Sequence, residues 1–88
     1  MKIIIAAAHE IGTHLAKLLS RLNHEVKLID PDEELLSRFG DYDLLTYCGS
    51  PSSIKTLTDV EVNDADLLVA VSLDEDMNLN ACYIAKYM

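Results

Sequence analysis

Basic residues are scarce in this 88-residue sequence, where seven Lys and Arg stand against fifteen Asp and Glu and the formal net charge is −8. No cluster of Lys or Arg offsets this acidity, so neither nucleic acid nor an anionic membrane surface is expected as a partner. The first apolar run, residues 3–8, ends at His9 and Glu10 and is too short for a secretory signal or a membrane span. We therefore expect a cytoplasmic protein without direct membrane insertion.

Cysteine is equally scarce, and the two that occur form no CxxC pair. Cys48 and Cys82 are therefore expected to be the reduced, buried thiols of a cytosolic protein, with Cys82 in the core. The length suits one domain or part of one, and half of the residues are hydrophobic, which is enough for one small core. A core of this size often depends on oligomerisation for its stability.

The sequence does contain an alternation of strand-like and helix-like segments, repeated four times. Short continuous apolar runs, typical of parallel strands covered on both faces, lie at residues 3–6, 26–29, 44–47 and 67–71. Amphipathic spacing and capping signals predict helices at residues 11–22, 31–39, 52–57 and 72–88. Right-handed crossovers between such units predict an α/β fold, a Rossmann-like parallel sheet of four strands in the order 3-2-1-4 with helices on both faces.

Two acidic segments carry signals for a helix start. Asp30 is predicted to cap the second helix, with Pro31 in its first turn and Glu33 completing a capping box. Ser72 and Glu75 form the same pattern before the fourth helix, whose acidic first turn complements the helix dipole. The loop before this helix also follows the fourth strand, where it can contact the far half of a ligand.

The loop after the first strand occupies the position of a nucleotide phosphate site. In a dinucleotide-binding fold it has the pattern G-x-G-x-x-G and lies where the strand order reverses. Here it is AAHEIG, so Gly12 alone remains, and Ala7 and His9 replace the other two glycines. Ala7 costs about 1 kcal/mol if its position needs a positive φ, and His9 either meets a phosphate when protonated or blocks it. The helix start still offers free amides and partial positive charge, so the anion site is impaired rather than absent.

His9 and His14 also resemble part of a zinc-binding pattern, H-E-x-x-H. Their separation is five residues rather than four, which places the two imidazoles about 140° apart around a helix. A third ligand is not evident, so we predict no metal site and expect His14 to face solvent.

Asp30 stands at the end of the second strand, 18 residues beyond Gly12. At this position a Rossmann carboxylate accepts hydrogen bonds from the ribose hydroxyls and disfavours a 2′-phosphate. The same residue is equally well explained as an ordinary helix cap before Pro31. Both interpretations remain open, and one side chain can serve both.

The third strand ends at the same edge of the sheet as Asp30, in the segment of Cys48, Gly49 and Ser50. They can line an adenine pocket, although the residues alone favour a plain loop in which Ser50 caps a short helix. A catalytic triad of His9, Ser72 and Asp74 is unsupported, because no G-x-S-x-G turn frames the serine.

Nearly the whole sequence resembles the amino-terminal RCK/KTN domain of TrkA-type potassium uptake regulatory proteins. Residues 1–30, MKIIIAAAHEIGTHLAKLLSRLNHEVKLID, are similar to the family's MKIIIAGAGEVG, LAKLLS and H-x-V-x-L-I-D segments. Residues 64–79 follow its A-D-L-L-I-A-V-T and D-x-x-N-L patterns, and residues 42–45 and 49–52 also fit.

The resemblance implies a cytoplasmic regulatory domain, not an enzyme, at the inner face of the cell membrane. It would sense NAD(H) or an adenine nucleotide (AMP, ADP or ATP) and gate a membrane potassium transporter or channel subunit. The site residues that it implies are a phosphate loop of Ala7, Ala8, His9, Glu10, Ile11 and Gly12, Asp30 at the ribose, Cys48, Gly49 and Ser50 beside the adenine, and Ala70, Val71 and Ser72 beside the centre of the ligand.

The sequence departs from this family in two respects. Ala7 and His9 stand where the family has glycines, which predicts weak nucleotide binding or none. The family's domain continues into a fifth and a sixth strand, so we expect residues 1–88 to be a single truncated nucleotide-binding domain whose strand 67–71 is an apolar edge. Such an edge pairs readily with another copy, which predicts a homo-oligomer. The alternative function is a ligand-free structural or oligomerisation half-domain with an impaired phosphate loop.

Overall fold

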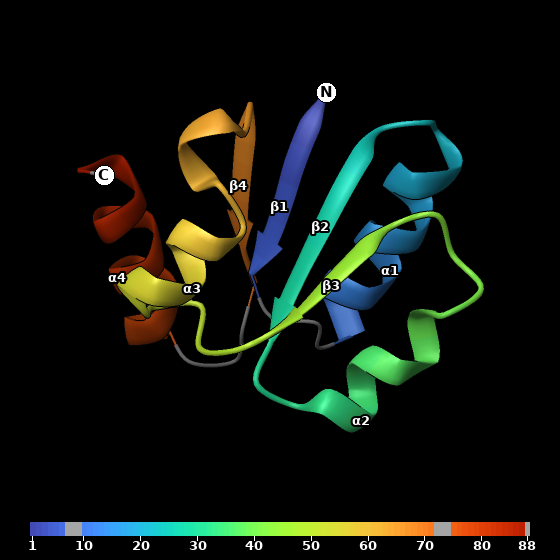
Figure 1. Cartoon of the computed structure of the whole chain (residues 1–88), viewed down its shortest axis with the longest axis horizontal. Coiled ribbons are helices and arrows are strands. Elements are labelled where there is room, and N and C mark those ends of the chain that lie inside the picture. The colour runs from blue at the N-terminus through green and yellow to red at the C-terminus, as the bar shows by residue number, and fades with distance from the viewer. Residues whose placement is uncertain (7–9, 72–74, 88) are drawn as a thin grey trace.

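The computed structural model describes residues 1–6, 10–71 and 75–87. Four strands form its sheet: β1 (Lys2–Ala6), β2 (Glu25–Asp30), β3 (Leu45–Cys48) and β4 (Leu67–Ala70). Their order is β3-β2-β1-β4, and the pairings of β1 with β2, β1 with β4 and β2 with β3 are all parallel (Figure 1). The predicted Rossmann-like sheet and its strand order are therefore confirmed.

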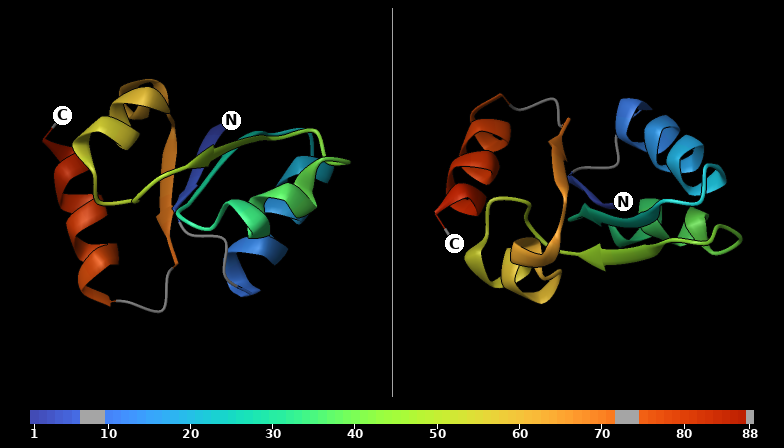
Figure 2. Two further views of the ribbon diagram at one scale, coloured as in Figure 1. Left: turned by 60° about the horizontal axis from the view of Figure 1, so that its bottom comes forward. Right: turned by 90° about the horizontal axis from the view of Figure 1, so that it is seen from above.

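Helices cover both faces of the sheet, as predicted. The first pair is α1 (Glu10–Arg21) and α2 (Glu33–Leu36), the latter continued by the 3-10 turn η1 (Ser37–Phe39). The second pair is α3 (Ile54–Asp59) and α4 (Glu75–Lys86), with the 3-10 turn η2 (Val62–Asp64) leading into β4. Figure 2 shows α1 and α2 on one side of the sheet and α3 and α4 on the other.

The sheet separates two apolar cores because successive side chains of a strand point to opposite faces. On the α1 side, Ile3 and Ile5 of β1 pack with Ala16 of α1 and with Phe39 of η1. On the α3 side, Ile4 packs with Leu57, Val60 and Val62. This two-sided burial explains why the central strands are continuous apolar runs rather than alternating ones.

The start of α2 differs from the prediction, which placed Asp30 at the cap and Pro31 in the first turn. The cap is Asp32, whose carboxylate accepts hydrogen bonds from the amides of Glu34 and Leu35 at 3.1 and 3.3 Å. Strand β2 runs as far as Asp30, so its backbone is committed to the sheet and the helix starts after Pro31.

The third helix is also shifted, to Ile54–Asp59 from the predicted residues 52–57. Ser53 caps it by accepting a hydrogen bond from the amide of Thr56 at 3.4 Å. The interpretation of Ser50 as this cap is wrong, because Ser50 lies in the preceding turn and accepts a hydrogen bond from the amide of Ser52 at 3.3 Å.

The prediction of buried thiols is wrong as well, since Cys48 and Cys82 are both free and exposed. Cys48 ends the edge strand β3, and Cys82 follows the buried Ala81 on α4 but is itself exposed. His14 faces solvent on α1, as predicted. The predicted capping box of Ser72 falls on residues outside those that the structure describes.

Within the described ranges, no helix has the length and apolar character needed to cross a bilayer. Residues 1–6, 10–71 and 75–87 also contain no cluster of three or more His, Cys, Asp or Glu side chains that could hold a metal ion. Strand β4 forms one edge of the sheet, and its first residue, Leu67, is 44% exposed.

Candidate functional site

The carboxyl ends of the four parallel strands meet at one edge of the sheet, and α1 and α4 begin at the same edge (Figure 1). The chain leaves β1 toward β2 on one side and reaches β4 on the other, so the strand order reverses between β1 and β4. Ala6 lies opposite Ala70 in the register, and the amide of Val71 donates to the carbonyl of Ala6 at 3.2 Å. The predicted site residues Ala70 and Val71 therefore lie at this switch point, where doubly wound sheets bind ligands.

Asp30 ends β2 at the same edge and is only 8% exposed. Its carboxylate accepts a hydrogen bond from the amide of Asp32 at 2.8 Å. Burying a carboxylate is costly unless hydrogen bonds compensate for the lost water. The turn at Pro31 thus holds the acidic group in a defined orientation at the strand end, where it can accept further hydrogen bonds.

The loop after β3 is attached to the end of β2. Cys48 lies opposite Asp30 in the β2–β3 register, and the amide of Gly49 donates to the carbonyl of Asp30 at 3.1 Å. The thiol of Cys48 donates to the carbonyl of Pro31 at 3.5 Å. The structure therefore brings together the predicted ribose acid and the predicted adenine loop.

Gly49 is required at its position for a steric reason. A Cβ atom there would lie 2.5 Å from Oγ1 and 3.1 Å from Cγ2 of Thr56 on α3. In the next residue, Ser50, the hydroxyl oxygen lies 3.1 Å from the hydroxyl oxygen of Ser52, within hydrogen-bonding distance. The missing side chain of Gly49 lets the loop pass close to α3 and keep its contact with β2.

The amino end of α1 contributes the next part of the site. The helix starts at Glu10, Gly12 is buried, and Ile11 is 68% exposed. The first amides of an α-helix have no partners within the helix, and together with the dipole they favour an anion. Four of the predicted site residues fall outside the described residues: Ala7, Ala8, His9 and Ser72.

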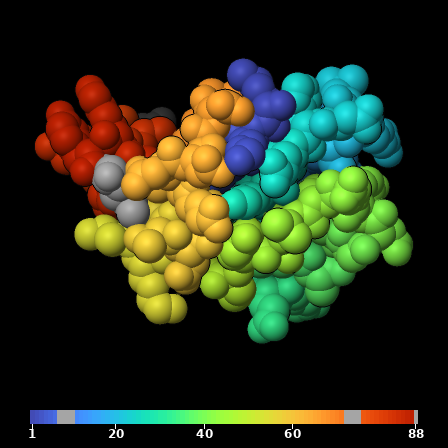
Figure 3. All heavy atoms as spheres, turned by 45° about the horizontal axis from the view of Figure 1, so that its top comes forward, coloured from blue at the N-terminus to red at the C-terminus, as the bar shows by residue number. Residues whose placement is uncertain are grey.

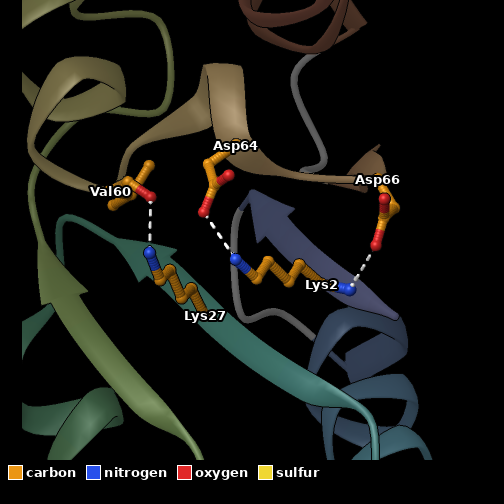
Figure 4. Close-up of polar contacts among 5 residues, drawn as sticks. All are labelled: Lys2, Lys27, Val60, Asp64 and Asp66. Carbon is orange, nitrogen blue, oxygen red and sulfur yellow. Dashed lines mark hydrogen bonds and ion pairs between the residues drawn. The ribbon is translucent and has the colours of Figure 1, made fainter.

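A second polar cluster, which the sequence did not predict, lies at the opposite, amino edge of the sheet. The amide of Lys2 donates to the carboxylate of Asp66 at 2.8 Å, and its ammonium group contacts Asp64 at 2.6 Å. The ammonium group of Lys27 donates to the carbonyl of Val60 at 2.9 Å (Figure 4). The hydrogen bond and charge of Asp64 raise the pKa of Lys2, and those of Lys2 lower the pKa of Asp64.

This amino-edge cluster positions β4 against β1. Besides the two side-chain contacts, the amide of Asp66 donates to the carbonyl of Lys2 at 2.8 Å. Figure 3 shows the start of β1 (blue) enclosed between the η2–β4 segment (orange) and β2 (teal). Strand register is continuous, so fixing the amino ends of β1 and β4 also fixes Ala6 and Ala70 at the site.

Comparison with known proteins places this arrangement in a family. A family model of the TrkA-N domain matches residues 3–88. The chain belongs to the TrkA-N domain family. This finding confirms the resemblance drawn from residues 1–30 and 64–79.

Curated relatives of this TrkA-N chain are potassium uptake proteins. The Trk system potassium uptake protein TrkA of Haemophilus influenzae is 41% identical over 83 residues, which is 93% of this chain and 18% of that protein. The Trk system potassium uptake protein trkA homolog 1 of Methanosarcina mazei is 42% identical over 86 residues, 98% of this chain and 21% of that protein. The chain thus spans about a fifth of the length of these two relatives.

A solved structure supports the fold. The Kef CTD of Shewanella denitrificans, described in its AMP-bound form, superposes with a TM-score of 0.80 at 23% sequence identity. The match covers 97% of this chain and 51% of that one. At this level of identity the likeness establishes the shared fold.

Proposed function

We propose that the chain is a cytoplasmic regulatory domain of a potassium uptake system, which binds NAD(H) or an adenine nucleotide and acts on a membrane potassium transporter. The relatives in Haemophilus influenzae and Methanosarcina mazei are named for potassium uptake, which supports this role. We infer a regulatory rather than a catalytic role, since the hydrogen-bond acceptors and helix amides of the candidate site are groups suited to recognising a ligand.

The observation that carries the proposal is the carboxylate of Asp30, 8% exposed at the carboxyl end of β2 beside the switch point. An acidic side chain at this place accepts hydrogen bonds from the two hydroxyls of an adenosine ribose. The loop at Cys48, Gly49 and Ser50 would then border the adenine. The AMP-bound form of the Kef CTD, which shares the fold, is in accord with an adenine nucleotide as the ligand.

The phosphates would lie at the loop of residues 7–12 and the start of α1, and Ala70, Val71 and Ser72 would flank the centre of the ligand. Ligand binding would favour one arrangement of the domain over another and so bias the attached transporter at the inner face of the membrane. By thermodynamic linkage, the transporter state would change nucleotide affinity by the same factor.

Calorimetric titration with AMP, ADP and NAD tests the proposal on the wild type and on Asp30→Asn. Asparagine keeps an oxygen for the amide of Asp32 but loses the charge, so we expect about tenfold weaker binding. Asp32→Asn, which changes the cap of α2, serves as the matched control and should bind like the wild type.

Absence of both heat and a thermal shift for all three nucleotides would contradict nucleotide sensing. The same absence after reversion of Ala7 and His9 to glycine would favour the alternative, a structural half-domain that assembles without a ligand. Equal nucleotide affinity of the wild type and Asp30→Asn would instead show that the charge of Asp30 does not contribute to nucleotide binding.

A further inference from the structure

Strand β2 places a charged side chain, Lys27, on the face of the sheet that α3 covers. Lys27 shares this face with Ile29, because successive side chains of a strand point to opposite faces. Ile29 is completely buried in the apolar cluster that contains Leu57 and Val60. An ammonium group beside such a cluster needs a polar partner. The ammonium group of Lys27 has one at the end of α3, where it donates to the carbonyl of Val60 at 2.9 Å (Figure 4).

The carbonyl of Val60 is a favourable place for a cation. The last carbonyls of a helix have no partner within it, and the helix dipole makes this end partially negative. Val60 caps α3 and is completely buried, so the ammonium group of Lys27 takes the place of water at this carbonyl. The next residue, Glu61, has a left-handed backbone with φ 58° and turns the chain away from the helix. Lys27 therefore contacts the point at which α3 ends.

Helix α3 depends on contacts with the rest of the chain for its position. It has six residues, too few for a helix that is stable by itself, and Leu57 is the one residue within it that is buried. Its ion pair, Lys55 with Asp59, lies along the helix with the two groups 3.7 Å apart, so this pair does not attach the helix to the sheet. The contact of Lys27 does join the helix to the sheet.

The other end of α3 lies against the candidate nucleotide site. Thr56, in the first turn, occupies the space beside Gly49, where a Cβ atom would lie 2.5 Å from its Oγ1. The amide of Gly49 in turn donates to the carbonyl of Asp30. Within the helix, the amide of Val60 donates to the carbonyl of Thr56 at 3.0 Å. One helical turn therefore connects the Lys27 contact with the Gly49 loop, and both ends of this path return to β2.

We propose that Lys27 is a positioning residue of the candidate nucleotide site. Its ammonium group holds the end of α3 on β2, which keeps Thr56 against Gly49 and so keeps the loop after β3 in contact with Asp30. Lys27 lies three residues before Asp30 on β2, away from the carboxyl edge of the sheet, and would not touch the ligand itself. This role rests on the proposed nucleotide binding, although the position of the loop can be measured without a nucleotide.

Calorimetric titration with ADP tests this role in Lys27→Met, which keeps the apolar stem and loses the ammonium group. We expect about fivefold weaker binding, because the loop beside Asp30 is no longer held by α3. Lys27→Arg keeps a cation and N–H donors for the carbonyl of Val60. It should therefore restore the affinity to within about twofold of the wild type.

The thiol of Cys48 reports the position of the loop without a nucleotide. It is exposed, directly precedes Gly49, and donates to the carbonyl of Pro31 at 3.5 Å. In a Cys82→Ser background Cys48 is the one thiol of the chain. Its rate of reaction with a disulfide reagent should rise about threefold in Lys27→Met, because a displaced loop loses the contact with Pro31. The rate should return to that of the wild type in Lys27→Arg.

Two control variants separate the position of the loop from the stability of the fold. Val26→Ala removes buried apolar atoms beside Lys27 but on the opposite, α1 face of β2. It should lower the midpoint of urea denaturation and leave the ADP affinity and the Cys48 rate unchanged. Lys55→Met removes an ammonium group from α3 whose side chain is 88% exposed, and it should also leave both unchanged.

Three results would overturn the role of Lys27. The first is a Lys27→Met variant with the ADP affinity and the Cys48 rate of the wild type. The second is an equal change of both quantities in Val26→Ala, which would reduce the effect to stability. The third is a Lys27→Arg variant that behaves like Lys27→Met. Circular dichroism verifies folding, and Lys27→Gln, which keeps a shorter neutral donor, replaces Lys27→Met if that variant unfolds.

Failure of the proposed nucleotide binding gives a different result. A wild type that binds no ADP, together with a raised Cys48 rate in Lys27→Met, would contradict nucleotide binding and still support the hold of Lys27 on the loop.

Discussion

The amide of Gly49 donates a hydrogen bond of 3.1 Å to the carbonyl oxygen of Asp30, which joins the loop after β3 to the end of β2. The bond places the two parts of the candidate nucleotide site next to each other. It is possible only because position 49 has no side chain, since Thr56 of α3 fills the space that a Cβ atom would need.

Gly49→Ala should therefore lower both stability and nucleotide affinity. A Cβ 2.5 Å from Oγ1 of Thr56 forces the loop or the helix to move, and overpacking of this kind costs about 1–3 kcal/mol. Urea denaturation measures the first effect and calorimetry the second. Adding Thr56→Ala removes the two obstructing atoms and should restore part of the stability and part of the affinity. The control is Gly40→Ala, whose Cβ would lie 3.8 Å from the carbonyl oxygen of Ser37, an ordinary contact, and it should change the affinity little.

Asp30 should also set the preference between NAD and NADP. A carboxylate at the ribose repels a 2′-phosphate, so we expect the wild type to bind NADP at least about tenfold more weakly than NAD. Asp30→Asn removes the repulsion and should reduce the ratio of the two dissociation constants to about threefold or less. Competition titrations give the ratio directly. A ratio unchanged by Asp30→Asn, or altered equally by Asp32→Asn, would show that the charge of Asp30 does not face the ribose.

The strand order could be predicted because it depends on patterns that extend over whole segments. The apolar runs around Ile4, Leu28 and Val69 identify strands covered on both faces, and alternation with helices leaves few topologies. Asp30 could be placed at the edge of the sheet by the same reasoning, because the end of β2 follows from the end of its apolar run.

The helix caps and the cysteines could not be predicted with the same success, because they depend on single side chains. Asp30 and Asp32 flank Pro31, and either side chain can cap a helix. The start of α2 therefore depends on how far β2 pairs with β3. Cys82 follows the buried Ala81, and one residue of rotation on α4 exposes its thiol. The contacts of Lys2 with Asp64 and Asp66 join residues more than 60 positions apart and leave no local signal.

Reversion of the phosphate loop should strengthen nucleotide binding. Ala7→Gly relieves about 1 kcal/mol if the position has a positive φ, and His9→Gly lets a phosphate approach the backbone, so the double variant should bind ADP about tenfold more tightly. Both positions lie outside the described residues, and the expectation follows from the A-x-H-x-x-G pattern of the sequence. Calorimetry on the single and double variants measures the affinity for ADP. His14→Gly, farther along α1, is the control for the loss of an imidazole. Unchanged ADP affinity in the double variant would mean that this loop does not contact the phosphates.

The contact between Lys2 and Asp64 should stabilise the fold only over a defined range of pH. The folded-state pKa of Asp64 is lowered from 3.8, so its contribution is present above that value and is lost as pH falls through the folded-state pKa. The pKa of Lys2 is raised from 10.5, so its contribution is present below that value and is lost as pH rises through the folded-state pKa. A double-mutant cycle of Lys2→Met and Asp64→Asn, followed by urea denaturation, should give a small coupling free energy that is constant from about pH 5 to pH 10 and disappears at both extremes.

The side chains of Lys2 and Asp64 are 51% and 60% exposed, so their coupling should also weaken in high salt. The pair of Lys55 and Asp59, 3.7 Å apart on α3, is the matched control and should show weaker coupling, because it joins neighbouring turns of one helix rather than two distant segments. A coupling for Lys2 and Asp64 that persists unchanged at pH 2 would contradict an ionic origin.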